Sequence, residues 1–393
     1  MALPVTISDI RLGDQNSYHG PFKSSGSNFY TVAQDGGSDG TLRAYKATDP
    51  TSSFPQVDTS TNSPTVNSVI PSFWVFQDGD NLHAIVVEKS GAVSVQYARF
   101  DMSSDTWVDV DTGVEIVTIE ITGNTQTAHA VTIAVRSDGD IPVAYQGDSD
   151  MVMGTEYERI DWNVSTDSGV TWAGPVSIDN GGRVNWTGCV IVPGSSDRMH
   201  VFFKDDTAND VFQRTIRSDD SLETFPSLFD ANVTTENYIF GPGVSYDDGG
   251  TQRVRCPYRN TTPKVSIAKL DSADTPTLTT DADVSDNTVR STNSSVTVAL
   301  AVDVKDLQLL YANNADLDLY RDTNDDDAGW GTDTEELDAV TVNHISSNVY
   351  DRSGTQRLAF VYDDGGTVKY NEIDLAAVTV SVIHLTLAPY ISA

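Results

Sequence analysis

Short apolar runs alternate with clusters of turn residues along the whole chain, a pattern typical of β-strands and not of helices. One unit has four such runs, at 72–76, 82–87, 93–100 and 107–110. A unit near the other end repeats this plan at 345–350, 358–362, 368–373 and 378–387. Each unit is therefore predicted to form a four-stranded antiparallel sheet.

One segment carries a complete turn motif after its third strand. Residues 165–172 match S-x-D-x-G-x-T-W in full, through Ser165, Asp167, Gly169, Thr171 and Trp172. An aspartate at the start of a turn accepts backbone N–H groups, and glycine permits a positive φ. The tryptophan is expected to pack between neighbouring sheets. The motif is predicted to be structural.

Aspartates recur at a near-constant period, with steps of 52, 66, 53, 51, 51 and 52 residues. The long step contains an extra loop at 147–154. These anchors, all expected at equivalent turns between third and fourth strands, are Asp49, Asp101, Asp167, Asp220, Asp271, Asp322 and Asp374. Seven four-stranded repeats of about 50 residues are typical of a β-propeller.

The predicted fold is thus all-β: one seven-bladed β-propeller domain of four-stranded antiparallel blades spanning residues 1–393. The expected blades are approximately 16–64, 65–122, 127–182, 184–233, 236–287, 292–340 and 343–388. The C-terminal strand is expected to complete its own blade. This leaves the strand at 4–10 as a latch on the ring or as a tether to a partner.

The 165–172 motif resembles the Asp box (BNR repeat) of sialidase-like propellers. That resemblance implies fold but no activity, because Asp boxes occur in enzymes and binding proteins alike. Sialidase catalysis would require three arginines near the axis. The predicted inner strands contain almost none, so no catalytic residue is assigned. Because a general glycosidase needs only two carboxylates, a glycoside hydrolase remains the alternative function.

The charge balance limits the classes of molecule that are expected as binding partners. The chain has 24 Lys and Arg against 57 Asp and Glu, a net charge of −33. Such a surface repels phosphates and anionic headgroups, so nucleic acid and membranes are not expected as partners. Neutral glycans or neighbouring proteins fit better. Tyr18, Trp186 and Tyr238 precede or begin inner strands, where aromatic rings could stack on sugars or pack between blades.

Two groups of residues are candidate metal ligands. His19, His129 and His344 lie at or before inner strands, although ordinary polar strand starts are the favoured interpretation. An acidic loop with oxygen ligands at alternate positions resembles a calcium loop. Its candidate ligands are Asp322, Asn324, Asp326 and Asp333. A solvated acidic turn is the favoured interpretation, and calcium is the one cofactor that the sequence suggests.

Compartment and assembly follow from weaker signals. Cys189 and Cys256 are expected to be buried free thiols. The N-terminus has no signal-peptide pattern and no apolar run is long enough for a membrane span. The Lys-poor, Thr-, Asn- and Asp-rich composition resembles that of phage tail, fibre or head-decoration proteins. The protein is therefore expected to be a non-enzymatic structural or adhesion propeller of a virus particle. If it is not part of a particle, a cytoplasmic location is expected. Oligomers would form through the N-terminal strand.

Overall fold

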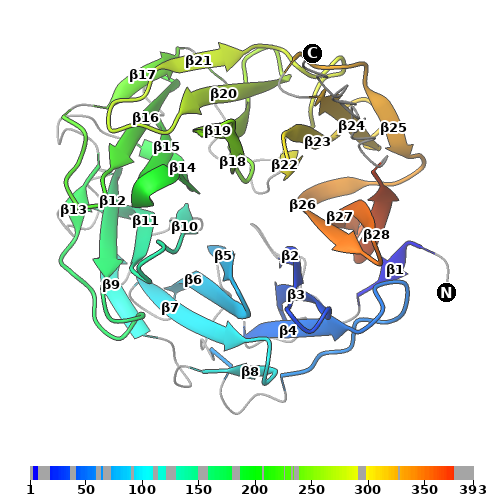
Figure 1. The fold of residues 1–393 in the computed structure, drawn as a ribbon, viewed down its shortest axis with the longest axis horizontal. Helices are drawn as coiled ribbons and strands as arrows, with labels where there is room; N and C mark the ends of the chain where they lie inside the picture. The colour runs from blue at the N-terminus through cyan, green and yellow to red at the C-terminus, as the bar shows by residue number, and fades with distance from the viewer. Residues whose placement is uncertain are drawn as a thin grey trace, which may run out of the picture.

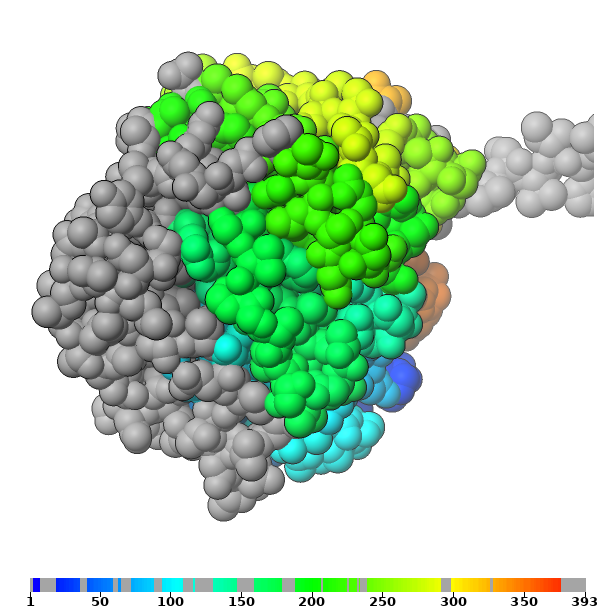
Figure 2. Space-filling view, turned by 90° about the vertical axis from the view of Figure 1, so that its left-hand side faces the viewer, coloured from blue at the N-terminus to red at the C-terminus, as the bar shows by residue number. Residues whose placement is uncertain are grey.

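The computed structural model describes residues 3–7, 18–35, 41–58, 63–64, 72–89, 93–108, 114–120, 130–148, 158–178, 186–205, 208–224, 226–231, 233, 239–290, 298–325 and 328–375. Within these residues the strands form seven antiparallel sheets around a common axis (Figure 1). The short helical turn η1 (Ser195–Asp197) lies in blade four. The predicted seven-bladed β-propeller of four-stranded antiparallel blades is confirmed. Figure 2 shows the disc edge-on, with blades three and four in green at its rim.

Within each blade the strands follow in chain order from the axis outward. Blade one comprises β2 (Tyr18–Lys23), β3 (Phe29–Gln34) and β4 (Leu42–Ala47). Blade two comprises β5 (Ser72–Asp78), β6 (Asn81–Lys89), β7 (Val93–Asp101), β8 (Thr106–Trp107) and β9 (Val114–Glu120). Blade three comprises β10 (Val131–Ile133), β11 (Ile141–Asp148), β12 (Glu158–Ser165) and β13 (Val176–Ser177), and blade four comprises β14 (Trp186–Pro193), β15 (Met199–Asp205), β16 (Asp210–Ile216) and β17 (Ser227–Asp230). Blade five comprises β18 (Val244–Asp248), β19 (Thr251–Arg259), β20 (Val265–Asp271) and β21 (Leu278–Asp281). Blade six comprises β22 (Val298–Asp303), β23 (Asp306–Ala312), β24 (Leu319–Asn324) and β25 (Thr334–Leu337). Blade seven comprises β26 (Val342–Arg352), β27 (Thr355–Asp364) and β28 (Thr367–Asp374).

The innermost strands form a closed ring around the axis. Each contacts the next in the order β2, β5, β10, β14, β18, β22, β26 and back to β2. The second strand of a blade lies between two neighbouring blades, so both of its faces are covered. Every residue of β3 and of β15 is buried, whereas the outer strands β21 and β25 are half-exposed. This explains why second strands are rich in apolar residues.

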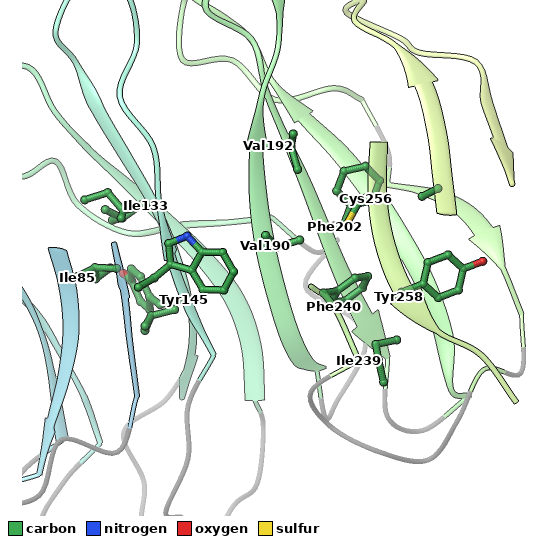
Figure 3. Close-up of a cluster of buried hydrophobic side chains, with 14 of the residues drawn as sticks. Ile85, Ile133, Tyr145, Val190, Val192, Phe202, Ile239, Phe240, Cys256 and Tyr258 are labelled. Atoms are coloured by element: carbon green, nitrogen blue, oxygen red, sulfur yellow. The ribbon is translucent and has the colours of Figure 1, made fainter. Parts of the chain in front are cut away.

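The hydrophobic core is divided into layers between neighbouring blades. The largest cluster runs from blade two to blade five and includes Val190, Phe202 and Tyr258 (Figure 3). Cys189 and Cys256 are buried free thiols, as predicted, and burial raises the pKa of both. No helix among the described residues has the length and apolar character needed to cross a membrane.

The N-terminal strand closes the ring. β1 (Val5–Thr6) pairs with β28 through Val5↔Tyr370 and Thr6↔Lys369, and the amide of Ile7 donates to the Val368 carbonyl at 2.9 Å. β1 therefore occupies the outer position of blade seven, beside β28 in Figure 1. The expected C-terminal strand at 378–387 lies outside the described residues. Of the two roles considered for the N-terminal strand, this pairing favours the latch.

Candidate functional site

A cavity of about 270 Å³ lies on the propeller axis. It is lined by inner strands of six blades, so no single repeat contains it. The phenylalanine and tryptophan side chains in its wall are Phe22 and Trp74, which are almost completely buried, and Phe76, which is partly exposed. The other lining residues are His19, Gly20, Pro21, Val75, Gln77, Ile191, Pro193, Pro242, Gly243, Val244, Leu300, Ala301, Val302, Ser346, Ser347 and Asn348.

Two polar groups of the cavity have hydrogen-bonding capacity that the protein does not use. Gln77 donates through Nε2 to the carbonyls of Lys23 at 2.7 Å and Gly79 at 2.9 Å, so its Oε1 stays available as an acceptor. The Ser347 hydroxyl is buried and has no hydrogen-bond partner. A buried hydroxyl without a partner costs free energy, and a ligand could supply the missing bond.

The other polar groups of the cavity are already partnered. Ser346 Oγ accepts from the amide of Gly20 at 3.1 Å, and Asn348 Oδ1 accepts from the amide of Val349 at 2.8 Å. His19 Nε2 donates to the Phe73 carbonyl at 3.0 Å. These bonds fix the wall of the cavity between blades seven, one and two.

The cavity carries no charge among its described lining residues. Its only titratable side chain is His19, and burial, together with the neighbouring His344, lowers the pKa of His19 to about 3. The imidazole is therefore neutral at pH 7. A pair of catalytic carboxylates and a cluster of arginines are both missing from this described wall.

Buried histidines predict acid sensitivity. Burial, reinforced by Arg99 and Arg198 respectively, lowers the pKa of His83 to about 4 and of His200 to about 3. The unfolded chain then binds more protons than the folded one below about pH 6.5, so stability falls as pH drops through this window. Each such histidine contributes a slope of about 1.4 kcal/mol per pH unit. We expect His200→Gln to reduce the slope by about that amount in urea unfolding between pH 6 and 4. An unchanged slope would show that His200 is already charged in the folded state.

Two of the predicted ligand residues begin inner strands. Tyr18 and Trp186 begin β2 and β14, and Tyr238 lies outside the described residues. Sequence reasoning missed Trp74 and Phe76, although both belong to the apolar run at 72–76. Of the three candidate histidine ligands, His19 and His344 are buried with ring centroids 6.3 Å apart, while His129 lies outside the described residues.

The motif at 165–172 forms a hydrogen-bonded turn after β12. Asp167 Oδ1 accepts from the Thr171 amide at 2.8 Å, and Oδ2 accepts from the Thr171 hydroxyl at 2.6 Å. These bonds lower the pKa of Asp167. Ser165 Oγ donates to Asp167 Oδ1 at 2.8 Å and accepts from the Gly169 amide, also at 2.8 Å. The turn is thus held by its own side chains.

This turn packs against the preceding blade. Gly169 has a φ of +91°, and its Cα faces the ring of Tyr97 on β7. The ring of Trp172, which is partly buried, lies 5.5 Å from the Tyr97 ring. The structure therefore places the motif at 165–172 at the junction of blades two and three.

The degenerate anchors do not all occupy equivalent turns. Asp49 accepts from the Thr51 amide at 3.0 Å, and Asp101 accepts from the Ser103 amide at 2.8 Å, so both form short turns of the same kind. In blade four the corresponding acceptor is Asp219, which accepts from the Ser221 amide at 3.0 Å. The assignment of Asp220 to this role is wrong. Its left-handed backbone, with a φ of +64°, turns its carboxylate towards Arg136, 2.6 Å away.

The last three anchors differ again. Asp271 and Asp374 end β20 and β28 and form cross-strand ion pairs with Arg253 and Arg357 of the adjacent second strand. Asp322 lies within β24 and is buried, so its placement in an exposed turn is wrong. Of the other candidate calcium ligands, Asn324 is buried, Asp333 is partly buried and Asp326 lies outside the described residues.

Comparisons with known proteins agree on the architecture. No protein-family model and no curated protein sequence matches the chain. Similar solved structures include an ulvan lyase bound to a saccharide of GlcA and Rha3S units, with a TM-score of 0.55 and 11% identity over 95% of this chain and 97% of the lyase. The α-L-arabinanase of Penicillium chrysogenum, complexed with arabinobiose, has a TM-score of 0.52 and 9% identity over 95% of this chain and 98% of the arabinanase. A sialidase mutant of Trypanosoma rangeli has a TM-score of 0.45 and 11% identity, covering 80% of this chain and 56% of the sialidase. At these identities the likeness is one of fold: the chain is similar to β-propellers.

Proposed function

We propose that the chain is a non-enzymatic propeller that binds a neutral glycan in its axial cavity. The observation that carries this proposal is the uncharged cavity, in which aromatic rings stand beside the unused acceptor of Gln77 and the unpartnered hydroxyl of Ser347. Sugar rings combine an apolar face with hydroxyl groups that donate and accept, so they match this combination. The cavity is small for a ligand site, which suits the end of a glycan better than an internal segment.

The charge of the protein selects against acidic sugars. With a net charge of −33 and no cation in the described cavity wall, a uronic or sialic acid would be repelled without a compensating contact. The α-L-arabinanase that is similar in fold is complexed with arabinobiose, so this fold can accommodate a neutral saccharide. Display on a phage particle, where the propeller would serve adhesion, stays a prediction from composition.

The binding test uses Ser347→Ala. Removing a hydroxyl that has no protein partner should leave the thermal unfolding midpoint unchanged or slightly raised, because nothing in the fold depends on it. Binding of neutral glycans, identified on a glycan array and measured by calorimetry, should weaken about tenfold. The matched control is Ser245→Ala, which removes a hydroxyl from inner strand β18 outside the cavity.

Three outcomes would contradict the proposal. One is equal weakening by the Ser245 control, and another is an array that shows only acidic glycans. The third is release of reducing sugar from a bound polysaccharide, abolished by a single substitution in the cavity wall. This last outcome would establish the glycoside hydrolase alternative.

A further inference from the structure

Two aspartates of blade six lie side by side across an antiparallel pair. β24 pairs with β25 through Arg321↔Thr334, and the amide of Gly331 donates to the Thr323 carbonyl at 2.9 Å. These two contacts bracket Asp322 on one strand and Asp333 on the other. The chain is tight here, since a Cβ at Gly331 would lie 3.2 Å from Asp322 Oδ1. Asp322 and Asp333 are therefore neighbours across this pair, where the register shifts by one residue between Arg321↔Thr334 and Asn324↔Trp330.

Each of these carboxylates has one committed oxygen and one unused oxygen. Asp322 Oδ1 accepts from the Thr323 amide at 2.7 Å, and Asp333 Oδ2 accepts from the Asp286 amide at 2.6 Å and from the Tyr311 hydroxyl. Asp322 Oδ2 and Asp333 Oδ1 are inaccessible to solvent and have no hydrogen-bond partner. Asp322 is 1% exposed, so water does not solvate its free oxygen.

This arrangement is unfavourable without a positive charge. Like charges directly opposite each other destabilise a β-pair, and a buried carboxylate needs a partner or a metal. In the part of the chain that the structure describes, neither carboxylate forms an ion pair with lysine or arginine.

We propose that Asp322 and Asp333 bind a calcium ion through their two unused oxygens. Ca²⁺ takes six to eight oxygen ligands in flexible geometry, including backbone carbonyls and water, whereas Mg²⁺ demands a near-octahedral shell. The bound ion would neutralise both carboxylates. Because Asp286 and Asp333 also bond to each other's backbone amides, the ion would tie the connection between blades five and six to the outer edge of blade six.

A second acidic cluster in the same blade provides a control. Asp318, Glu335 and Asp338 have carboxylate oxygens within 4.8 Å of one another. Glu335 and Asp338 are exposed, and Asp318 Oδ1 accepts from the Val340 amide at 2.9 Å. This cluster has no unpartnered buried oxygen, so solvent and the backbone already satisfy it.

The test begins with full-length protein freed of metal by EDTA. Added Ca²⁺ should raise the thermal unfolding midpoint, and added Tb³⁺ should give luminescence on tryptophan excitation, because Trp330 bridges to Asn324 two residues from Asp322. Asp322→Asn should weaken both responses at least tenfold, whereas Glu335→Gln should leave both unchanged. In EDTA, Asp322→Asn should melt at or above the wild-type midpoint, since it removes one of two facing charges; this shows that the variant folds.

Two outcomes would overturn the proposed calcium site. A wild-type midpoint that does not respond to Ca²⁺ overturns the proposal and indicates that the two carboxyl groups share a proton instead. A response abolished by Glu335→Gln but retained by Asp322→Asn places the ion at the exposed cluster and equally overturns it. Glycan binding at the axis is measured separately, so neither result bears on the proposed function.

Discussion

Gly169→Ala is expected to destabilise the propeller by about 3 kcal/mol or more, measured as the change in the free energy of unfolding in urea. The added Cβ would lie 2.0 Å from Cε1 of Tyr97, a separation that atoms do not tolerate. The Tyr97 ring cannot easily move away, because it is fully buried and its hydroxyl bonds to His83 Nδ1 at 2.9 Å. The positive φ of Gly169 adds a further backbone cost.

A matched glycine separates these two costs. Gly139 has a φ of +92°, against +91° for Gly169, and no atom lies within 4 Å of its Cβ position. Gly139→Ala therefore carries only the backbone cost of about 1 kcal/mol. The excess loss at Gly169 measures the contact between blades two and three. Equal losses at the two sites would mean that the motif at 165–172 acts only as a local turn.

The repeat was predictable because its signal is local. The strand runs and turn residues lie within single blades, and successive blades repeat them with a period of about 50 residues. The motif at 165–172 could be assigned residue by residue because all of its hydrogen bonds lie inside the turn. The turn aspartates of the degenerate copies of this motif were harder to assign. Asp219 and Asp220 are adjacent, and only the backbone conformation decides which of them faces the turn.

The cavity could not be predicted, because six blades contribute to it. Which residues of an inner strand face the axis depends on register, and β-bulges interrupt the simple alternation between His19 and Phe22 and between Thr187 and Cys189. An aromatic residue in an inner strand therefore looks the same in the sequence whether it lines the cavity or the core. For this reason the sequence did not distinguish Trp74, which lines the cavity, from the core residues of the same apolar run.

Burial of Asp322 was also invisible in the sequence. Six consecutive polar residues at 322–327 are typical of an exposed turn, yet β24 continues to Asn324. The strand is extended by pairing with a segment that follows the turn, as the bridge between Asn324 and Trp330 shows. Tertiary pairing thus overrides the local preference of polar residues for turns.

Ile7→Asp is expected to open the ring, with a loss of about 4 kcal/mol in unfolding free energy and a lower melting temperature. Val5 is 4% exposed and Ile7 is 2% exposed. Both pack in the cluster that joins blade seven to blade one, beside Phe54 and Tyr370. A charge at Ile7 would be buried there without a partner, and β1 would have to leave β28.

The residue between them provides the control. Thr6 is exposed on the opposite side of β1, so Thr6→Asp should change the unfolding free energy by less than about 0.5 kcal/mol. This alternation separates the two roles of the strand. A latch requires its inward residues for the stability of the monomer, whereas a tether would lose only self-association, measured by analytical ultracentrifugation, when either residue is changed. If Ile7→Asp melts like the wild type but no longer self-associates, the pairing of β1 with β28 is dispensable for closure and the strand serves a partner.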